Sequence, residues 1–250
     1  MRTITSLPSV VFSVVVGGLS IVAPATAHAQ TPPTSAAVVA ARDDSTRTNL
    51  KGVIADSLKL VLMEHLTRVA IQSKTRKELD GPFFGDYVRS VKRPRQWQDT
   101  DGFLINYVGH PIHGAAAAFI FIEHSPTSRA QPFGWNKEYL DSRWRPVLAS
   151  ALYSLQFEIG PLSEASIGNV GQRTETTGWV DYVVTPVGAL GLMFGEDALD
   201  RLLEKIEGKV ENRFARMMLR ISFGPSRAMS NAAMGRAPWH RDGRPVNWKK

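Results

Sequence analysis

The sequence predicts an all-α protein: a compact helical bundle of about four main helices, with short apolar core helices and an extended basic C-terminal tail. Apolar residues recur at steps of three and four along several stretches, which is the periodicity of a helix that buries one face. No stretch alternates apolar and polar residues in the way that strands do. The chain has 250 residues, of which 43% are hydrophobic, and this length favours a single domain with one core.

The N-terminal residues predict export. Within residues 1–29, Arg2 is the only charged residue, an apolar stretch runs from Val10 to Val22, and small residues at Ala27 and Ala29 resemble a cleavage site. We therefore expect a signal peptide over 1–29, with a retained membrane anchor as the alternative. The apolar stretch is shorter than the about 20 residues that a membrane span needs. Residues 30–49 are rich in proline, serine and threonine and predict a disordered leader.

The amino-acid composition and the net charge indicate a cellular compartment and a class of binding partner. The sequence contains no cysteine, which excludes disulfides, thiolate ligands and a catalytic thiol. An exported chain without cysteine is typical of the bacterial envelope, so we expect a periplasmic protein or one associated peripherally with the outer or inner membrane. The formal net charge is +7, and basic residues cluster over 74–95 and 220–250. Such clusters favour an anionic membrane surface, or an envelope protein, as the partner rather than nucleic acid; a merely solvated surface is the alternative.

The predicted helical domain covers residues 50–221, and its first helix is amphipathic and begins at Leu50. Three apolar helices are expected at Val108–Ile122, Pro146–Ile159 and Val183–Phe194, and the last continues as an amphipathic segment to about Met217. Each apolar stretch has 12 to 15 residues, which suits the core of a bundle; partial membrane insertion is the alternative. Residues 222–250 are rich in proline, glycine and arginine and predict an extended tail.

Two histidines, His110 and His113, stand at the head of the second helix. Pro111 favours the first helical position, which makes His110 the expected N-cap and puts both histidines on one side of the first turn. The positive end of the helix dipole disfavours imidazolium, so we expect both side chains to be neutral. Neutral imidazole can bind a metal, accept a hydrogen bond or act as a base.

The other two apolar helices each carry one carboxylate among small residues. Glu158 lies in the last turn of the third helix, and Asp181 lies at the head of the fourth. Because a buried carboxylate needs a partner, we predict that His110, Glu158 and Asp181 lie close together, with His113 beside them. Arginine is an alternative partner for Glu158, from Arg143 or Arg145. A stripe of glycines is expected to allow close helix packing there, at Gly188, Gly191 and Gly195.

This predicted polar cluster has two interpretations. It is a buried hydrogen-bond network that fixes the register of the helices, or it is a functional site. His110, His113, Glu158 and Asp181 are a sufficient ligand set for zinc or iron, although the H-E-x-x-H motif is absent. In the second interpretation His110, Glu158 and Asp181 are also the candidate catalytic residues.

The run D-x-F-x-x-N-Y-x-G-H-P-x-x-G, from Asp101 to Gly114, resembles the signature of an uncharacterised bacterial envelope domain family. The similarity extends over about Tyr87 to Trp239, through the Glu158 helix, DYVVTPVGALGLMFGE at 181–196 and FGPSRAMSNAAMGRAPW at 223–239. The order of His, Glu, Asp and Gly along apolar helices is also faintly similar to VanZ-like membrane proteins. The resemblance implies an envelope location and a site around these residues, and it implies no reaction.

The sequence therefore leaves two functional hypotheses. The leading one is a non-enzymatic envelope component that associates with a membrane surface or an envelope protein. The competing one is a metal-dependent or His/Glu-based envelope hydrolase that acts on a lipid or cell-wall substrate. They differ in whether the clustered residues surround an open cleft or form a closed network.

Overall fold

The computed structural model describes residues 46–79, 82, 84–85, 87–88, 97–98, 101–166 and 178–246. Within these ranges the regular elements are helices, which confirms the all-α prediction. The predicted signal peptide, residues 30–45 of the predicted leader and much of the basic segment 74–95 lie outside the described residues.

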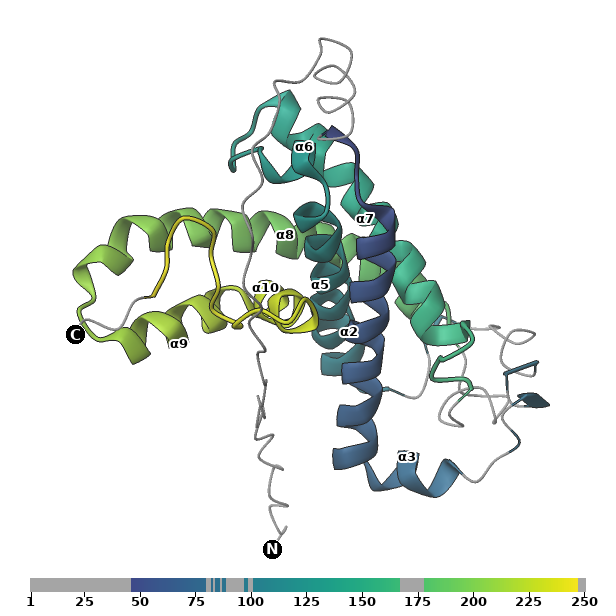
Figure 1. The fold of residues 1–250 in the computed structure, drawn as a ribbon. Helices are drawn as coiled ribbons and strands as arrows, with labels where there is room; N and C mark the ends of the chain where they lie inside the picture. Colours follow the sequence, from purple (N-terminus) through teal and green to yellow (C-terminus); the bar gives the residue numbers. More distant parts are fainter. Residues whose placement is uncertain are drawn as a thin grey trace, which may run out of the picture.

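The helices follow one another along the chain and pack as a bundle with one projecting arm (Figure 1). Within the described residues, no helix combines the length and the apolar character that a membrane crossing needs. The elements are α2 (Leu50–Ile71), α3 (Ser73–Glu78), the π-helical turn η1 (Ile105–Gly109), α5 (His110–Glu123), α6 (Pro126–Arg129), α7 (Lys137–Ile159), α8 (Val180–Ile206), the 3-10 turn η2 (Glu207–Lys209), α9 (Arg213–Phe223) and α10 (Pro225–Ala233).

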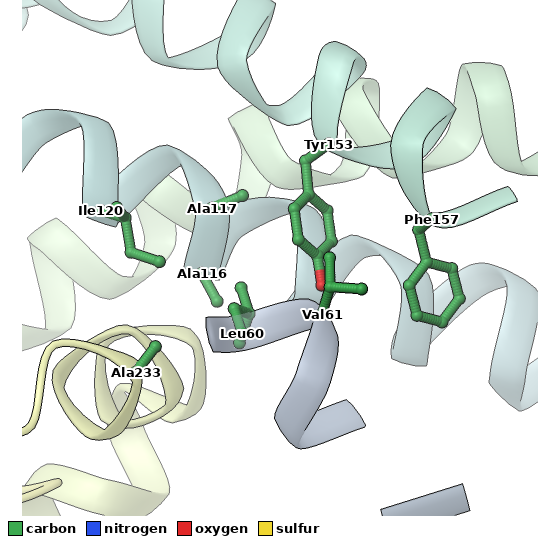
Figure 2. Packing of buried hydrophobic residues seen from close by; sticks show 8 residues of the cluster. All are labelled: Leu60, Val61, Ala116, Ala117, Ile120, Tyr153, Phe157 and Ala233. Carbon is green, nitrogen blue, oxygen red and sulfur yellow. The ribbon is translucent and has the colours of Figure 1, made fainter. Parts of the chain in front are cut away.

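Helix α5 lies at the centre of the bundle and contacts α2, α7, α8 and α10. Its run of four alanines, Ala115–Ala118, is buried, and these small side chains let the neighbouring helices approach closely. The prediction that this apolar stretch is a core helix is therefore confirmed. Figure 2 shows the apolar cluster that α5 shares with α2, α7 and α10: Leu60, Val61, Ala116, Ala117, Ile120, Tyr153, Phe157 and Ala233.

The start of α7 differs from the prediction. The helix begins at Lys137 rather than at Pro146, because the side chain of Asn136 accepts a hydrogen bond from the backbone N–H of Tyr139 at 2.9 Å and caps the helix there. Pro146 lies inside the helix, where it removes one backbone donor and its ring crowds the preceding turn.

Helix α2 begins at Leu50, which is the predicted start of the helical domain. The side chain of Asn49 accepts a hydrogen bond from Gly52 N at 3.0 Å, and its backbone N–H donates to the carbonyl oxygen of His124 at 2.9 Å. The chain is thus fixed against the end of α5 just before α2 begins.

Helix α2 turns polar side chains inward and most of its leucines outward. Asp56, Glu64 and His65 are buried together with Leu60 and Val61. The sequence predicts that the apolar side of this amphipathic helix faces the core, but five apolar residues at steps of four are exposed. These are Leu50, Ile54, Leu58, Leu62 and Leu66.

The predicted amphipathic extension of the fourth helix is interrupted. Helix α8 ends at Ile206, the turn η2 contains Gly208, and the side chain of Asn212 accepts a hydrogen bond from Ala215 N at 3.0 Å to cap the separate helix α9. In Figure 1, α8 runs away from the bundle and α9 returns beside it.

The predicted extended tail is wrong for residues 225–233, which form α10. Both carboxylate oxygens of Glu196, on α8, accept hydrogen bonds from backbone N–H groups at the start of α10: Ser226 at 2.8 Å and Arg227 at 3.1 Å. A carboxylate at a helix N-terminus satisfies donors that have no partner within the helix. Pro225 at the first helical position also fits this start.

The end of the chain does not display its arginines as a basic surface either. Arg241 donates to Asp200 at 2.8 Å, and Arg244 donates to Glu207 at 3.1 Å. These pairs attach the segment after α10 to the arm formed by α8 and α9. The cationic tail predicted from composition is therefore largely neutralised by carboxylates of the same domain.

Candidate metal centre

His110 is the first residue of α5 and is buried. The predicted N-cap role for its side chain is wrong, because the chain is already helical before it: Gly109 occupies the N-cap position, and no side chain caps the helix. The backbone N–H of His110 donates to the carbonyl oxygen of Ile105 in η1. The π-helical turn, rather than a cap, fixes where the imidazole enters the bundle.

The structure brings His110, Glu158 and Asp181 together, as the sequence predicted. Nδ1 of His110 lies 3.6 Å from Oδ1 of Asp181 and 3.8 Å from Oε1 of Glu158. One potential ligand atom from each residue lies within 4.8 Å of the others, and all three side chains are buried. We call these residues the HED group.

The two carboxylates of the HED group are held at opposite kinds of helix end. Asp181 lies in the first turn of α8, where the helix dipole favours a negative charge, and Glu158 lies in the last turn of α7, where the dipole opposes it. The hydroxyl of Ser154 donates to the backbone carbonyl oxygen of Asp181 at 3.0 Å and ties α7 to α8. Burial, and then the charges of Glu158 and Asp181, raise the pKa of the nearby Tyr182 hydroxyl above its ordinary value. The centre is thus rich in buried negative charge.

His113 lies beside the HED group, but its Nδ1 atom faces another carboxylate. That atom is 3.5 Å from Oε1 of Glu64 on α2, and Oε2 of Glu64 accepts a hydrogen bond from the hydroxyl of Tyr153 at 2.5 Å. Burial raises the pKa of Glu64 to about 8. Burial, and then the nearby His110 and Arg68, lower the pKa of His113 to about 3. Glu64 and His113 therefore face each other in their uncharged forms near neutral pH.

Phe157 fixes the spacing of the imidazoles. Its ring meets the rings of His110 and His113 edge-on, with centroid distances of 6.0 and 6.1 Å, and it stacks on His65 at 5.1 Å. His65 also hydrogen-bonds through Nε2 to the carbonyl oxygen of Leu162 at 2.7 Å. His65 is thus a core histidine with one ring nitrogen hydrogen-bonded, and Phe157 separates it from the other two.

The crossing of α5, α7 and α8 beside the centre depends on Gly114. A Cβ atom at this position would lie 2.5 Å from Oγ of Ser150 and 2.9 Å from the backbone oxygen of Thr185. The predicted glycine stripe of α8 is confirmed only at Gly188, where a Cβ atom would lie 2.6 Å from Pro111. The other two glycines of that stripe, Gly191 and Gly195, have open space beside them.

A second polar region lies where α8, α10 and the last described residues meet. Its cavity of about 480 Å³ is lined by arginines and carboxylates, among them Arg143, Asp197 and Arg227. Arg143 donates to Asp197 from Nε at 3.0 Å and from Nη2 at 2.9 Å, and Arg227 pairs with the same residue. Arg143 is therefore the partner of Asp197 and not of Glu158, and Arg145 is exposed.

Glu64 is the residue of this centre that sequence reasoning missed. Its only signal was that, with His65, it interrupts the apolar periodicity of α2. A carboxylate in that position indicates a polar partner inside the core, but the partners, Tyr153 and His113, lie on other helices and cannot be read from the local pattern.

Comparisons with family models, with curated proteins and with solved structures found no match to this chain.

Proposed function

We propose that this protein is an exported bacterial envelope protein whose helical domain binds one divalent transition-metal ion, zinc or iron, through the HED group. The observation that carries the proposal is the convergence of one imidazole nitrogen and two carboxylate oxygens from three separate helices within 4.8 Å. Export, with a periplasmic or membrane-peripheral location, rests on the N-terminal sequence alone.

The spacing of the HED group supports a metal ion. Bonds of about 2.0–2.2 Å to a tetrahedral zinc ion place the ligand atoms about 3.4 Å apart. The distances of 3.6 and 3.8 Å from the His110 imidazole to the carboxylates of Asp181 and Glu158 are close to that spacing. They are long for charge-assisted hydrogen bonds, which measure about 2.7–2.9 Å. The HED group therefore fits an ion better than it fits a direct network between these atoms.

The charges of the two carboxylates in the HED group also support a bound metal ion. Two carboxylates within a few ångströms of each other in a buried place repel, and a cation between them would offset that repulsion. A divalent ion neutralises both carboxylates at once, and it offsets the unfavourable position of Glu158 at the end of α7. It would also join the beginnings of α5 and α8 to the end of α7.

Hydrolysis is the second candidate function, because the HED group supplies three ligands rather than four. Catalytic zinc sites keep their fourth position for water, and the ion lowers the pKa of that water to about 7. A lipid or a cell-wall component would then be the substrate class. Glu64 would remain protonated near neutral pH and would not serve as the general base.

The metal proposal is tested by adding zinc, or ferrous iron without oxygen, to chelator-treated protein and following its melting temperature. A ligand that binds only the folded state stabilises it by about 2.7 kcal/mol at one hundred times its Kd. We expect the wild-type protein to be stabilised and Asp181→Asn to lose most of the effect. Asp141→Asn, which changes an exposed aspartate of α7, is the matched control and should respond like wild type. If neither metal stabilises the wild-type protein, the proposal is wrong.

A further inference from the structure

Helix α2 buries its carboxylates and exposes a row of apolar side chains, although Leu60 and Val61 also face the core. Its two carboxylates, Asp56 and Glu64, are buried, whereas Leu50, Ile54, Leu58, Leu62 and Leu66 are between 46 and 61% exposed. These five residues recur at steps of four, so each lies one turn from the next and together they form a stripe that winds gradually around the exposed side of the helix. We call them the α2 apolar face. The stripe is long, because a helix of 22 residues extends about 33 Å.

Helix α7 likewise buries polar side chains and exposes apolar ones, although Tyr153 and Phe157 also face the core. Its buried residues include Arg143, Ser154 and Glu158, whereas the apolar side chains on its outside are between 44 and 62% exposed. Those exposed residues are Trp144, Leu148, Leu152 and Leu155. The two helices contact each other through Tyr153 and Glu64. Exposed rows of apolar side chains on two contacting helices are unexpected for a surface that meets only water.

The charges on α2 identify what covers its apolar face. No carboxylate of α2 is exposed: Asp56 is buried and bonds to His124 and Lys59, both at 2.7 Å, and Glu64 is buried in the core. The exposed charges of the helix are the lysines Lys51 and Lys59. An outer surface of leucines flanked by lysines, without carboxylates, matches an anionic bilayer, where leucines enter the acyl boundary and lysines meet the headgroups.

A second copy of the chain fits this face less well. Two-fold symmetry places the same surface on both sides of an interface, so lysines from the two copies would meet with no exposed carboxylate of α2 to pair with them.

We propose that the α2 apolar face is a membrane-docking surface, on which the protein lies with α2 in the plane of an anionic bilayer. The proposal is independent of the HED group, because none of the five residues belongs to it.

The experiment measures binding of the mature protein, without the predicted signal peptide, to vesicles of phosphatidylglycerol and phosphatidylethanolamine at low salt, by flotation. We expect wild-type protein to bind, and Leu58→Glu and Leu62→Glu each to reduce the partition coefficient at least about tenfold, because each removes apolar area that enters the bilayer and adds a negative charge. Leu202→Glu is the matched control, since Leu202 is 53% exposed but lies on α8. It should bind like wild type, and all variants should keep the wild-type circular dichroism spectrum.

A second set of measurements varies the salt concentration and the charge of the lipid. Lys51→Gln with Lys59→Gln should weaken binding at low salt and leave a smaller salt dependence, and vesicles of phosphatidylcholine alone should bind less protein. The proposal is overturned if the wild-type protein does not bind anionic vesicles. It is also overturned if the α2 variants bind as wild type does, or if light scattering shows a dimer that Leu62→Glu dissociates. Metal binding, measured on the same variants, should be unchanged, so this test and the test of the HED group fail separately.

Discussion

Nδ1 of His110 lies 3.6 Å from Oδ1 of Asp181, so the first turns of α5 and α8 direct an imidazole and a carboxylate at the same buried place. Substitutions at two side chains this close have coupled effects on the free energy of unfolding, whether a metal ion or a proton lies between them. The pair, together with Glu158, therefore connects α5, α7 and α8 at one buried place.

The first prediction concerns this coupling. His110→Ala and Glu158→Gln should each destabilise the protein by about 1–3 kcal/mol, because each leaves a buried partner without its neighbour. The double variant should lose less than the sum of the single losses, by at least about 0.5 kcal/mol. Urea denaturation of the four proteins gives this difference. Additive losses would mean that His110 and Glu158 do not interact.

The second prediction concerns helix packing beside the centre. Gly114→Ala should destabilise the protein by about 1–3 kcal/mol, because the new Cβ would meet Thr185 backbone and Ser150. Gly191→Ala is the matched control in α8, where nothing lies near the added atom. It should stabilise the protein by about 0.5–1 kcal/mol, because alanine is the better helix former. Thermal unfolding measures both, and equal effects would contradict the close crossing.

The third prediction is a dependence on pH from Glu64. Burial raises the pKa of this carboxyl to about 8 in the folded protein, above the ordinary value of 4.5. The folded state therefore holds the proton more tightly, and the contribution of Glu64 to stability is complete below the ordinary pKa and is lost as pH rises through about 8. The loss is at most about 1.4 kcal/mol per pH unit.

Glu64→Gln removes this titration. With a chelator present to exclude metal effects, the wild-type free energy of unfolding should fall between about pH 5 and pH 8 relative to that of Glu64→Gln. Denaturant titration at several pH values measures the difference, and parallel curves for the two proteins would show that Glu64 does not titrate as the structure indicates.

The fourth prediction concerns the arm. Arg220 donates to both oxygens of Glu207, each at 2.8 Å, and the pair is buried. Arg220→Ala should destabilise the protein by about 3 kcal/mol, because it removes both hydrogen bonds of a buried ion pair and leaves Glu207 with Arg244 as a partner. Lys137→Ala, which breaks an exposed pair with Asp141, is the control and should not change the denaturation midpoint measurably. Similar midpoints for all three proteins would contradict the buried pair.

Much of the candidate centre could be predicted from the sequence. Glu158 on a mostly apolar helix needed a buried partner, and His110 and Asp181 stood at the heads of the two neighbouring apolar helices. That argument found residues that the structure brings close together, although its premise that His110 is an N-cap is wrong. The π-helical turn before His110 is an irregularity that no spacing rule predicts.

The orientation of α2 could not be predicted, because apolar residues occur on both sides of this helix. Leu60 and Val61 are buried, whereas the stripe that includes Leu58 and Leu62 is exposed. Which side of α2 faces the core depends on Glu64, whose side chain points inward and bonds to Tyr153 of α7. Partners distant in sequence also explain the tail, where Glu196 caps α10 in a segment that composition alone assigns to an extended chain.

The metal content of the purified protein tests the central claim most directly. Elemental analysis of protein prepared without chelator should find about one zinc or iron ion per chain in the wild type and almost none in His110→Ala. His240→Ala, which changes an exposed histidine paired with Asp242, should keep the wild-type content. If the wild-type protein contains no metal and takes up none, or if His110→Ala retains as much as the wild type, the HED group does not bind a metal ion.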